Sequence, residues 1–262
     1  MAIFKTSSRF TLPFLLGIAG LVTIIISTII ILNNPKIIEI TWLASLFIVS
    51  GTLVIRFYSI DVDGFAATIN QTDPVNTDLD GRKFLNWMTI AMIIGLAATI
   101  IIHYSFEIGM GSYLLMQVAL IKSFSGIFPL RMSTIKNSGF GTLKKAATRS
   151  IIFWITTVIL IYTIFIYSGV DSLIVVPYVI AIGIMTHYTW YGLVYSKRNK
   201  FFRWFPIIAS GMFFFSDSLI GADLFGSFDV NIYLVHIIDL TYVFNIFLMS
   251  QAMLFQGPLK EK

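Results

Sequence analysis

Eight long apolar stretches follow one another along the chain, and they restrict its fold more than any other feature. A helix needs about 20 apolar residues to cross the hydrocarbon core of a membrane, which is about 30 Å thick. The stretches are too long for the strands of a membrane barrel and lack their period-two alternation. They are Phe10–Leu32, Ile37–Phe57, Phe84–His103, Gly109–Leu130, Ile151–Tyr167, Leu173–Tyr195, Phe201–Phe225 and Asn231–Phe255. The sequence therefore predicts an all-α integral membrane protein, with eight transmembrane helices in a single polytopic domain that covers residues 1–262.

The composition excludes the soluble alternatives. Of the 262 residues, 57% are hydrophobic and 12% are charged, whereas a soluble domain carries about 25% charged residues. A single soluble core of this size cannot bury so much apolar surface. A soluble enzyme and a nucleic-acid-binding protein are therefore excluded, and membrane lipids are the expected partners. The absence of cysteine excludes disulfides, thiolate metal sites and a cysteine nucleophile.

The positive charges predict the orientation of the spans. If the N-terminus is cytoplasmic, the outer loops contain only Lys36, and Lys122 lies within a span. The other 16 of the 18 Lys and Arg residues then fall on the cytoplasmic side, as the positive-inside rule requires. We therefore expect both termini in the cytoplasm. The Ile- and Lys-rich, cysteine-free composition points to the inner membrane of a bacterium.

Five titratable side chains lie within the predicted spans, namely Lys122, His187, Asp217, Asp223 and Asp239. A charged group at the centre of a membrane costs about 2.5–3.5 kcal/mol on insertion scales, so each is a functional candidate. Four others lie near span ends, where their side chains can reach water: Arg56, His103, Glu107 and His236.

The rise of 1.5 Å per helical residue places these groups by depth. Asp217 and Asp239 fall at about the same height in the outer half of their spans, with Lys122 just below them. His187 falls about two helix turns deeper, and Asp223 lies most of the way to the outer surface. This layering predicts a shared polar cavity. It also permits a purely structural ion pair between Lys122 and one aspartate, and a His187 that is hydrogen-bonded to a neighbour.

The sequence contains no phosphate-binding loop and no dinucleotide-binding glycine pattern. The three histidines lie on distant spans and do not have the spacing of a zinc site. We therefore expect neither a metal nor a cofactor.

Two segments near the C-terminus resemble the YhhN-type lysoplasmalogenase family. Phe213-Phe214-Phe215-Ser216-Asp217-Ser218, which follows a basic loop, is similar to the signature of that family's penultimate helix, and Thr241-Tyr242 is similar to a pattern in its last helix. The resemblance covers Phe205–Gln251. The family's Gly-Asp pair in the third helix and its Lys-Pro-Leu start of the second helix are absent here, and the region of Asn245 stands in place of a glutamine.

The resemblance implies an eight-helix membrane enzyme that hydrolyses the vinyl ether bond of lysoplasmalogens, releasing a fatty aldehyde and a glycerophospho-base. Such a site needs a general acid and a carboxylate that stabilises positive charge or activates water. The resemblance thus implies Asp217 and Asp239 as catalytic residues. The residues expected to bind a lysophospholipid substrate are Lys122, His187, Ser216, Tyr242 and Asn245.

Two other classes of function use the same residues. A polytopic transporter or ligand-binding receptor would need buried charges to carry protons or hold a solute. A structural membrane partner would need them only to lock helices together. The residue types alone do not separate these alternatives.

Overall fold

We describe the protein from a computed structural model of the chain. The structure describes residues 2–33, 41–60, 81–127, 148, 151, 154–159, 161–162, 166, 175–192, 200–225 and 232–255; within these ranges the side chains of 2–10, 31–33, 58–60, 81–82, 127, 222–225 and 232–234 are not described. These residues are helical apart from short turns, and they contain no strand. The predicted all-α fold is therefore confirmed for the described part of the chain.

Seven α-helices and one 3-10 helix have both ends within the described residues. They are α1 (Ala2–Asn33), α2 (Thr41–Ile60), α4 (Gly81–Ile101), α5 (Phe106–Ile127), α8 (Val176–Tyr191), α9 (Lys200–Phe225), α10 (Ile232–Ala252) and η3 (Met253–Phe255). Each α-helix coincides with one predicted apolar stretch. The remaining stretch, Ile151–Tyr167, is described only in pieces (151, 154–159, 161–162 and 166), and these are helical.

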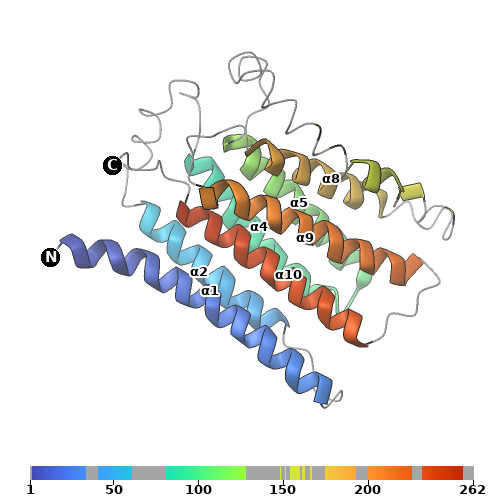
Figure 1. The fold of residues 1–262 in the computed structure, drawn as a ribbon, viewed down its shortest axis with the longest axis horizontal. Helices are drawn as coiled ribbons and strands as arrows, with labels where there is room; N and C mark the ends of the chain where they lie inside the picture. The colour runs from blue at the N-terminus through green and yellow to red at the C-terminus, as the bar shows by residue number, and fades with distance from the viewer. Residues whose placement is uncertain are drawn as a thin grey trace.

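The helices lie side by side, and successive helices run in opposite directions except α5 and α8, which start at the same end of the bundle (Figure 1). The start of α1 and the end of α10 are at the same end of the bundle, on the left in Figure 1. Helix α10 packs against α1, α2, α4 and α9, which places it at the centre. Its residues from Asn245 to Met253 are accordingly all buried.

Helices α4 and α5 form a tight antiparallel hairpin. Ser105 precedes α5, and its hydroxyl accepts a hydrogen bond from the backbone N–H of Ile108 at 3.4 Å, as an N-cap residue does. Glu107 adds a negative charge to the first turn of α5, where the helix dipole favours it. A β-carbon at Gly109 would lie 2.6 Å from the Cα of Ile102, so the two helices approach this closely only because residue 109 is glycine.

Polar side chains connect the helices inside the bundle. The Thr52 hydroxyl of α2 donates to the Ser250 hydroxyl of α10 at 2.8 Å. The Ser123 hydroxyl of α5 donates to the backbone carbonyl of Phe84 in α4 at 2.9 Å. Such bonds between helices satisfy hydroxyl groups that would otherwise lack a partner in an apolar surrounding.

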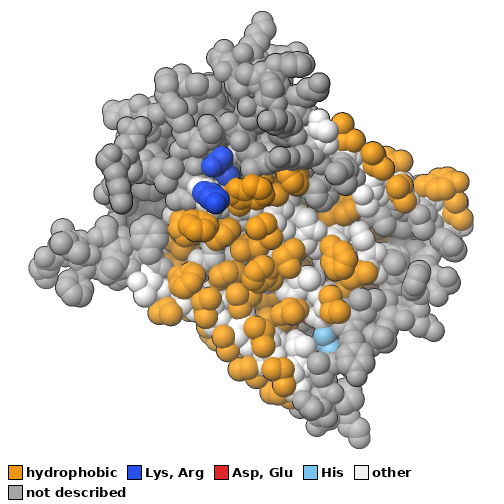
Figure 2. Space-filling model, viewed as in Figure 1, with side chains coloured by type: hydrophobic (Ala, Val, Ile, Leu, Met, Phe, Trp, Pro, Cys, Tyr) orange, Lys and Arg blue, Asp and Glu red, His pale blue; other side chains and the backbone are white. Residues whose placement is uncertain are grey.

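The outer surface of α1 is apolar. The side chains exposed along it include Leu12, Phe14, Leu15, Val22, Ile25, Ile26, Ile29 and Ile30. Figure 2 shows the same character over the described part of this face, with Lys and Arg side chains gathered at one edge. Four helices contain apolar segments long enough to cross a membrane: Thr11–Ile30, Lys83–Ile101, Lys200–Gly221 and Val235–Phe255. These features are those of an integral membrane protein that crosses the bilayer several times.

Candidate functional site

A cavity of about 160 Å³ lies between α4, α5, α8, α9 and α10 and is also lined by the first residue of α2. It begins at the end of the bundle where α5 and α8 start, near His103 and Phe106, and it reaches inward as far as Tyr242. Since Tyr242 is ten residues into α10, this depth is about 15 Å along the helix axis. The lining residues are Thr41, Thr99, Ile102, His103, Phe106, Met110, Tyr113, Val175, Tyr178, Val179, Ile182, Phe213, Phe214, Ser216, Asp217, Ser218, Ile220, Gly221, Ile238, Asp239 and Tyr242.

Most of the cavity wall is apolar. Met110 of α5, Ile182 of α8 and Phe214 of α9 belong to one cluster of buried hydrophobic side chains. On the other side, the ring of Phe213 meets the ring of Tyr242 edge-on, with 5.9 Å between ring centroids. A cavity with apolar walls and a few polar groups is typical of sites that bind small organic molecules.

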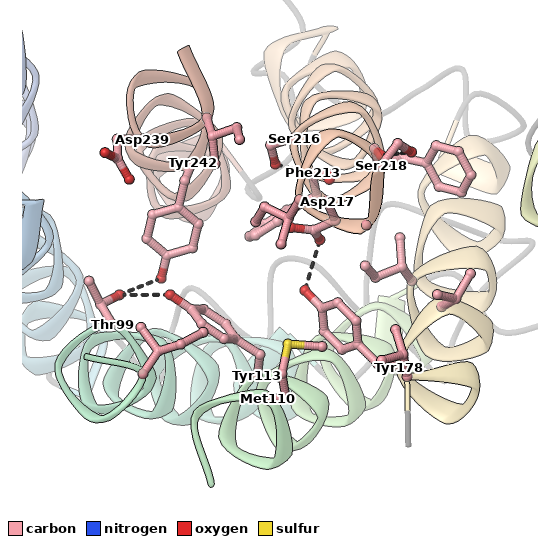
Figure 3. Close-up of a pocket in the computed structure, with 18 of the residues that line it drawn as sticks. Thr99, Met110, Tyr113, Tyr178, Phe213, Ser216, Asp217, Ser218, Asp239 and Tyr242 are labelled. Carbon is pink, nitrogen blue, oxygen red and sulfur yellow. Dashed lines mark hydrogen bonds between the residues drawn. The ribbon is translucent and has the colours of Figure 1, made fainter. Parts of the chain in front are cut away.

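The carboxyl group of Asp217 lies at the centre of the site. The hydroxyl of Tyr178, on α8, donates a hydrogen bond of 2.8 Å to Oδ2 of Asp217, on α9. Figure 3 shows the Asp217 side chain directed from α9 toward Tyr178. No other protein group within the described ranges bonds to Asp217. The second carboxyl oxygen, Oδ1, therefore has no protein partner among the described residues.

Three hydroxyl groups form a hydrogen-bonded cluster across the cavity from Asp217 (Figure 3). Thr99 Oγ1 lies 3.2 Å from the Tyr113 hydroxyl and donates to the Tyr242 hydroxyl at 3.0 Å. The Tyr242 hydroxyl donates to the backbone carbonyl of Gly95 at 3.3 Å. The rings of Tyr113 and Tyr242 also meet edge-on, with 5.7 Å between centroids. We call Thr99, Tyr113 and Tyr242 the hydroxyl cluster.

Four of the predicted site residues line this cavity: Ser216, Asp217, Asp239 and Tyr242. Ser216 is buried, and its hydroxyl donates to the backbone carbonyl of Phe213 at 3.1 Å. In Figure 3, however, Tyr242 lies between Asp239 and Asp217, so the two carboxyl groups do not face each other. The fold brings both aspartates to one cavity but not into a directly paired arrangement.

Lys122 is placed differently from the expectation. Its side chain is exposed on α5 and does not line the cavity. Asp217 has its hydrogen bond with Tyr178 instead, and no ion pair between Lys122 and Asp217 is present in the described part of the chain. The expected burial of Lys122 beside Asp217 is therefore wrong. The physical reason is rotation about the helix axis: Lys122 lies at a suitable depth on α5 but on its outward surface.

His187 also lies away from the cavity. Its Nδ1 accepts a hydrogen bond from the indole N–H of Trp154 at 3.3 Å, and its ring meets that of Tyr191 at 4.8 Å between centroids. This arrangement matches the structural alternative for His187, a histidine bonded to a neighbour.

Asn245 is fully buried below the cavity wall and does not line it. Neither polar atom of its side chain has a hydrogen-bond partner among the residues that the structure describes. The side chain of Asp223 lies outside the described residues. His236, which was expected to reach water near a span end, is buried instead.

The sequence reasoning did not identify Thr99, Tyr113, Tyr178 and His103 as site residues. Tyr113 and Tyr178 are single tyrosines in apolar spans, which are also common at the membrane interface. Thr99 is one of many threonines in the spans, and His103 was set aside because of its position at a span end. Thr99, Tyr113 and Tyr178 share only a hydroxyl group near one end of a predicted span, and His103 lacks this signal.

The described residues contain no group of three or more His, Asp or Glu side chains that could hold a metal ion. Comparison with known proteins gives no match, whether to a family model, a curated protein or a solved structure.

Proposed function

We propose that this protein is a membrane-embedded hydrolase that cleaves the vinyl ether bond of a lysoplasmalogen-like lipid. The observation that carries the proposal is the position of Asp217. Its carboxyl group lines an apolar cavity, and its bonded partner among the described residues is one tyrosine hydroxyl. An apolar cavity suits the hydrocarbon chain, and a carboxyl group supplies the acid that the reaction needs.

The chemistry requires one water molecule and no cofactor. An acid transfers a proton to the β-carbon of the vinyl ether, which leaves an oxocarbenium ion at the adjacent carbon. Water adds to that carbon and loses a proton, giving a hemiacetal. The hemiacetal then breaks its carbon–oxygen bond to release the free alcohol and the aldehyde. The proton given up by the added water restores the acid.

Asp217 is assigned as the general acid. Tyr178 occupies Oδ2, so the transferred proton is carried on Oδ1 and faces the substrate. Asp239 lines the same cavity beyond Tyr242. We assign it to the stabilisation of the positive charge that develops on the substrate, because a carboxylate in a water-poor site acts on charge over a longer range than it does in water.

The remaining predicted site residues fall into two groups, those that line the cavity and those that do not. Ser216 and Tyr242 line it and are assigned to substrate binding. Lys122, His187 and Asn245 do not line it, and we assign them no contact with the substrate. The likeness of the segment around Asp217 to YhhN-type lysoplasmalogenases supports the same reaction.

We further propose that the chain spans the membrane eight times with both termini in the cytoplasm, and that it resides in a bacterial inner membrane. The strong asymmetry of Lys and Arg between the two sets of loops supports this topology. The cavity then lies in the outer half of the membrane, because it begins at the end of the bundle opposite the start of α1.

The replacement Asp217→Asn tests the proposal. Asparagine keeps the shape and can still accept the Tyr178 hydrogen bond, but it carries no transferable proton. We expect turnover of a lysoplasmalogen per folded molecule to fall by about 10²–10⁴, with thermal unfolding little changed. The matched control is Glu107→Gln, which neutralises an exposed carboxyl group outside the cavity. It should leave turnover unchanged.

Two outcomes contradict the proposal. Normal turnover with lower thermal stability in Asp217→Asn would make Asp217 a structural residue. Purified wild-type protein that releases no aldehyde from any vinyl ether lipid would remove the hydrolase function, and a transporter or receptor would then be the better description of the cavity.

A further inference from the structure

We infer that the cavity recognises the uncharged glycerol part of its lipid through hydroxyl groups and leaves any phosphate outside. A 1-alkenylglycerol, which has no phosphate, is then a ligand and a substrate. This inference rests on the proposed function for the catalytic step, but not for the binding preference.

The charges of the cavity favour an uncharged ligand. Among the described lining residues there is no Lys and no Arg, and His103 is the one basic side chain. His103 is exposed in the turn between α4 and α5, at the entrance. Asp217 and Asp239 lie deeper. A phosphate moved into this space would leave water, meet no Lys or Arg among the described lining residues and approach two carboxyl groups, and each of these effects opposes its entry.

Few hydroxyl protons remain to bind a phosphate. The Tyr178 proton is used on Asp217. The Ser216 and Ser218 hydroxyls donate to carbonyl groups of their own helix, at 3.1 Å and 2.6 Å. A phosphate binds through several strong donors at once, and these three groups supply none.

The hydroxyl cluster suits an alcohol. Its three hydroxyl protons can run in one direction, from Tyr113 to Thr99, from Thr99 to Tyr242 and from Tyr242 to the Gly95 carbonyl. The Tyr113 oxygen then accepts a bond from the cavity. If Thr99 instead donates to the Gly95 carbonyl, at 2.9 Å, the Tyr242 proton becomes available. A group that can present either a donor or an acceptor matches a hydroxyl, which is both.

Thr41 supplies an independent sign of a hydroxyl-bearing ligand. It lines the cavity at the start of α2 and is 3% exposed. Its Oγ1 has no hydrogen-bond partner within the described ranges. Buried hydroxyl groups are rarely left without a partner, because this costs about 1–3 kcal/mol. A glycerol hydroxyl that enters the cavity supplies the hydrogen-bond partner that the Thr41 hydroxyl lacks.

The first experiment measures binding with two ligands that the reaction cannot cleave. They are 1-O-hexadecylglycerol and its 3-phosphate, which carry a saturated ether. We expect the purified protein to bind the glycerol ether at least tenfold more tightly than the phosphate. A smaller preference, or the reverse order, overturns the inference.

Two matched variants locate this binding in the cavity. Thr41→Val removes a hydroxyl at nearly constant shape and should weaken binding of the glycerol ether at least fivefold. Thr89→Val is the control, because the Thr89 hydroxyl is buried outside the cavity and bonds to the Leu85 carbonyl of its own helix. Equal binding by both variants and the wild type would also overturn the inference.

The second experiment measures aldehyde release from 1-alkenylglycerol and from the corresponding lysoplasmenylethanolamine. Rates within a factor of ten support the inference. Cleavage of the phosphate-bearing lipid alone overturns it while the proposed hydrolase function stands. If neither lipid is cleaved but the glycerol ether is still preferred, the hydrolase function fails and the ligand class is retained.

Discussion

The bond between Tyr178 and Asp217 joins the middle of α9 to the first turn of α8, and it connects the candidate acid to the fold at one oxygen atom. Pro177, at the second position of α8, favours a helix start here because its backbone angle is already helical. The tyrosine that follows is thereby fixed in the first turn of α8. The position of Asp217 thus depends on where a neighbouring helix begins.

We predict that Tyr178→Phe reduces both stability and turnover. The change removes one buried hydrogen bond, which contributes about 1–3 kcal/mol when it leaves a charged or polar group unpaired. Turnover should fall by about tenfold, since Asp217 is no longer held toward the substrate. In the double variant with Asp217→Asn, the two losses of turnover should not add, because Tyr178 acts by positioning the acid that Asp217→Asn already removes. Thermal unfolding and aldehyde release are measured for the wild type, the two single variants and the double variant. Additive losses of turnover would contradict a joint role of Tyr178 and Asp217.

At the scale of the elements, a glycine decides how closely α1 and α2 approach each other. A β-carbon at Gly20 of α1 would lie 2.7 Å from the backbone carbonyl of Ala44 in α2 and 2.8 Å from Ile48. A β-carbon at Gly111, on the exposed side of α5, would meet nothing within 4 Å. Only the first of these two glycines is required by packing.

We therefore predict opposite effects of the same substitution at the two positions. Gly20→Ala should lower the free energy of unfolding by about 1–3 kcal/mol, because α1 and α2 must separate to admit the methyl group. Gly111→Ala should raise it by about 0.5–1 kcal/mol, because alanine restricts the unfolded chain and favours the helix. Denaturation of the purified protein in a mild detergent measures both changes in the free energy of unfolding. An unchanged free energy of unfolding in Gly20→Ala would mean that α1 is not held this close to α2.

At the scale of the whole molecule, the proposed eight-span topology follows from the distribution of Lys and Arg along the sequence. Reporters that are active only outside the cytoplasm should be active after Lys36 and after Gly226. They should be inactive at the N-terminus and after Arg131. A cytoplasmic signal after Lys36 or Gly226 would contradict the eight-span topology, and with it the assignment of the cavity to the outer half of the membrane.

The sequence by itself determined the helical class and the place of each described helix along the chain. Apolar stretches of about 20 residues have one stable form in a membrane, because every backbone polar group must be bonded within the segment. The sequence also placed Asp217 among five functional candidates, since a charged group within such a stretch is costly. These conclusions need only local composition and spacing.

Only the tertiary structure decided which residues share the cavity with Asp217. Depth along a helix is readable from residue number, but the direction of a side chain around the axis depends on how neighbouring helices pack. For this reason Lys122, at a suitable depth, is exposed on α5, while Tyr178 on α8 and the hydroxyl cluster on α4, α5 and α10 meet the cavity. Asp239 reaches the same cavity but is separated from Asp217 by Tyr242.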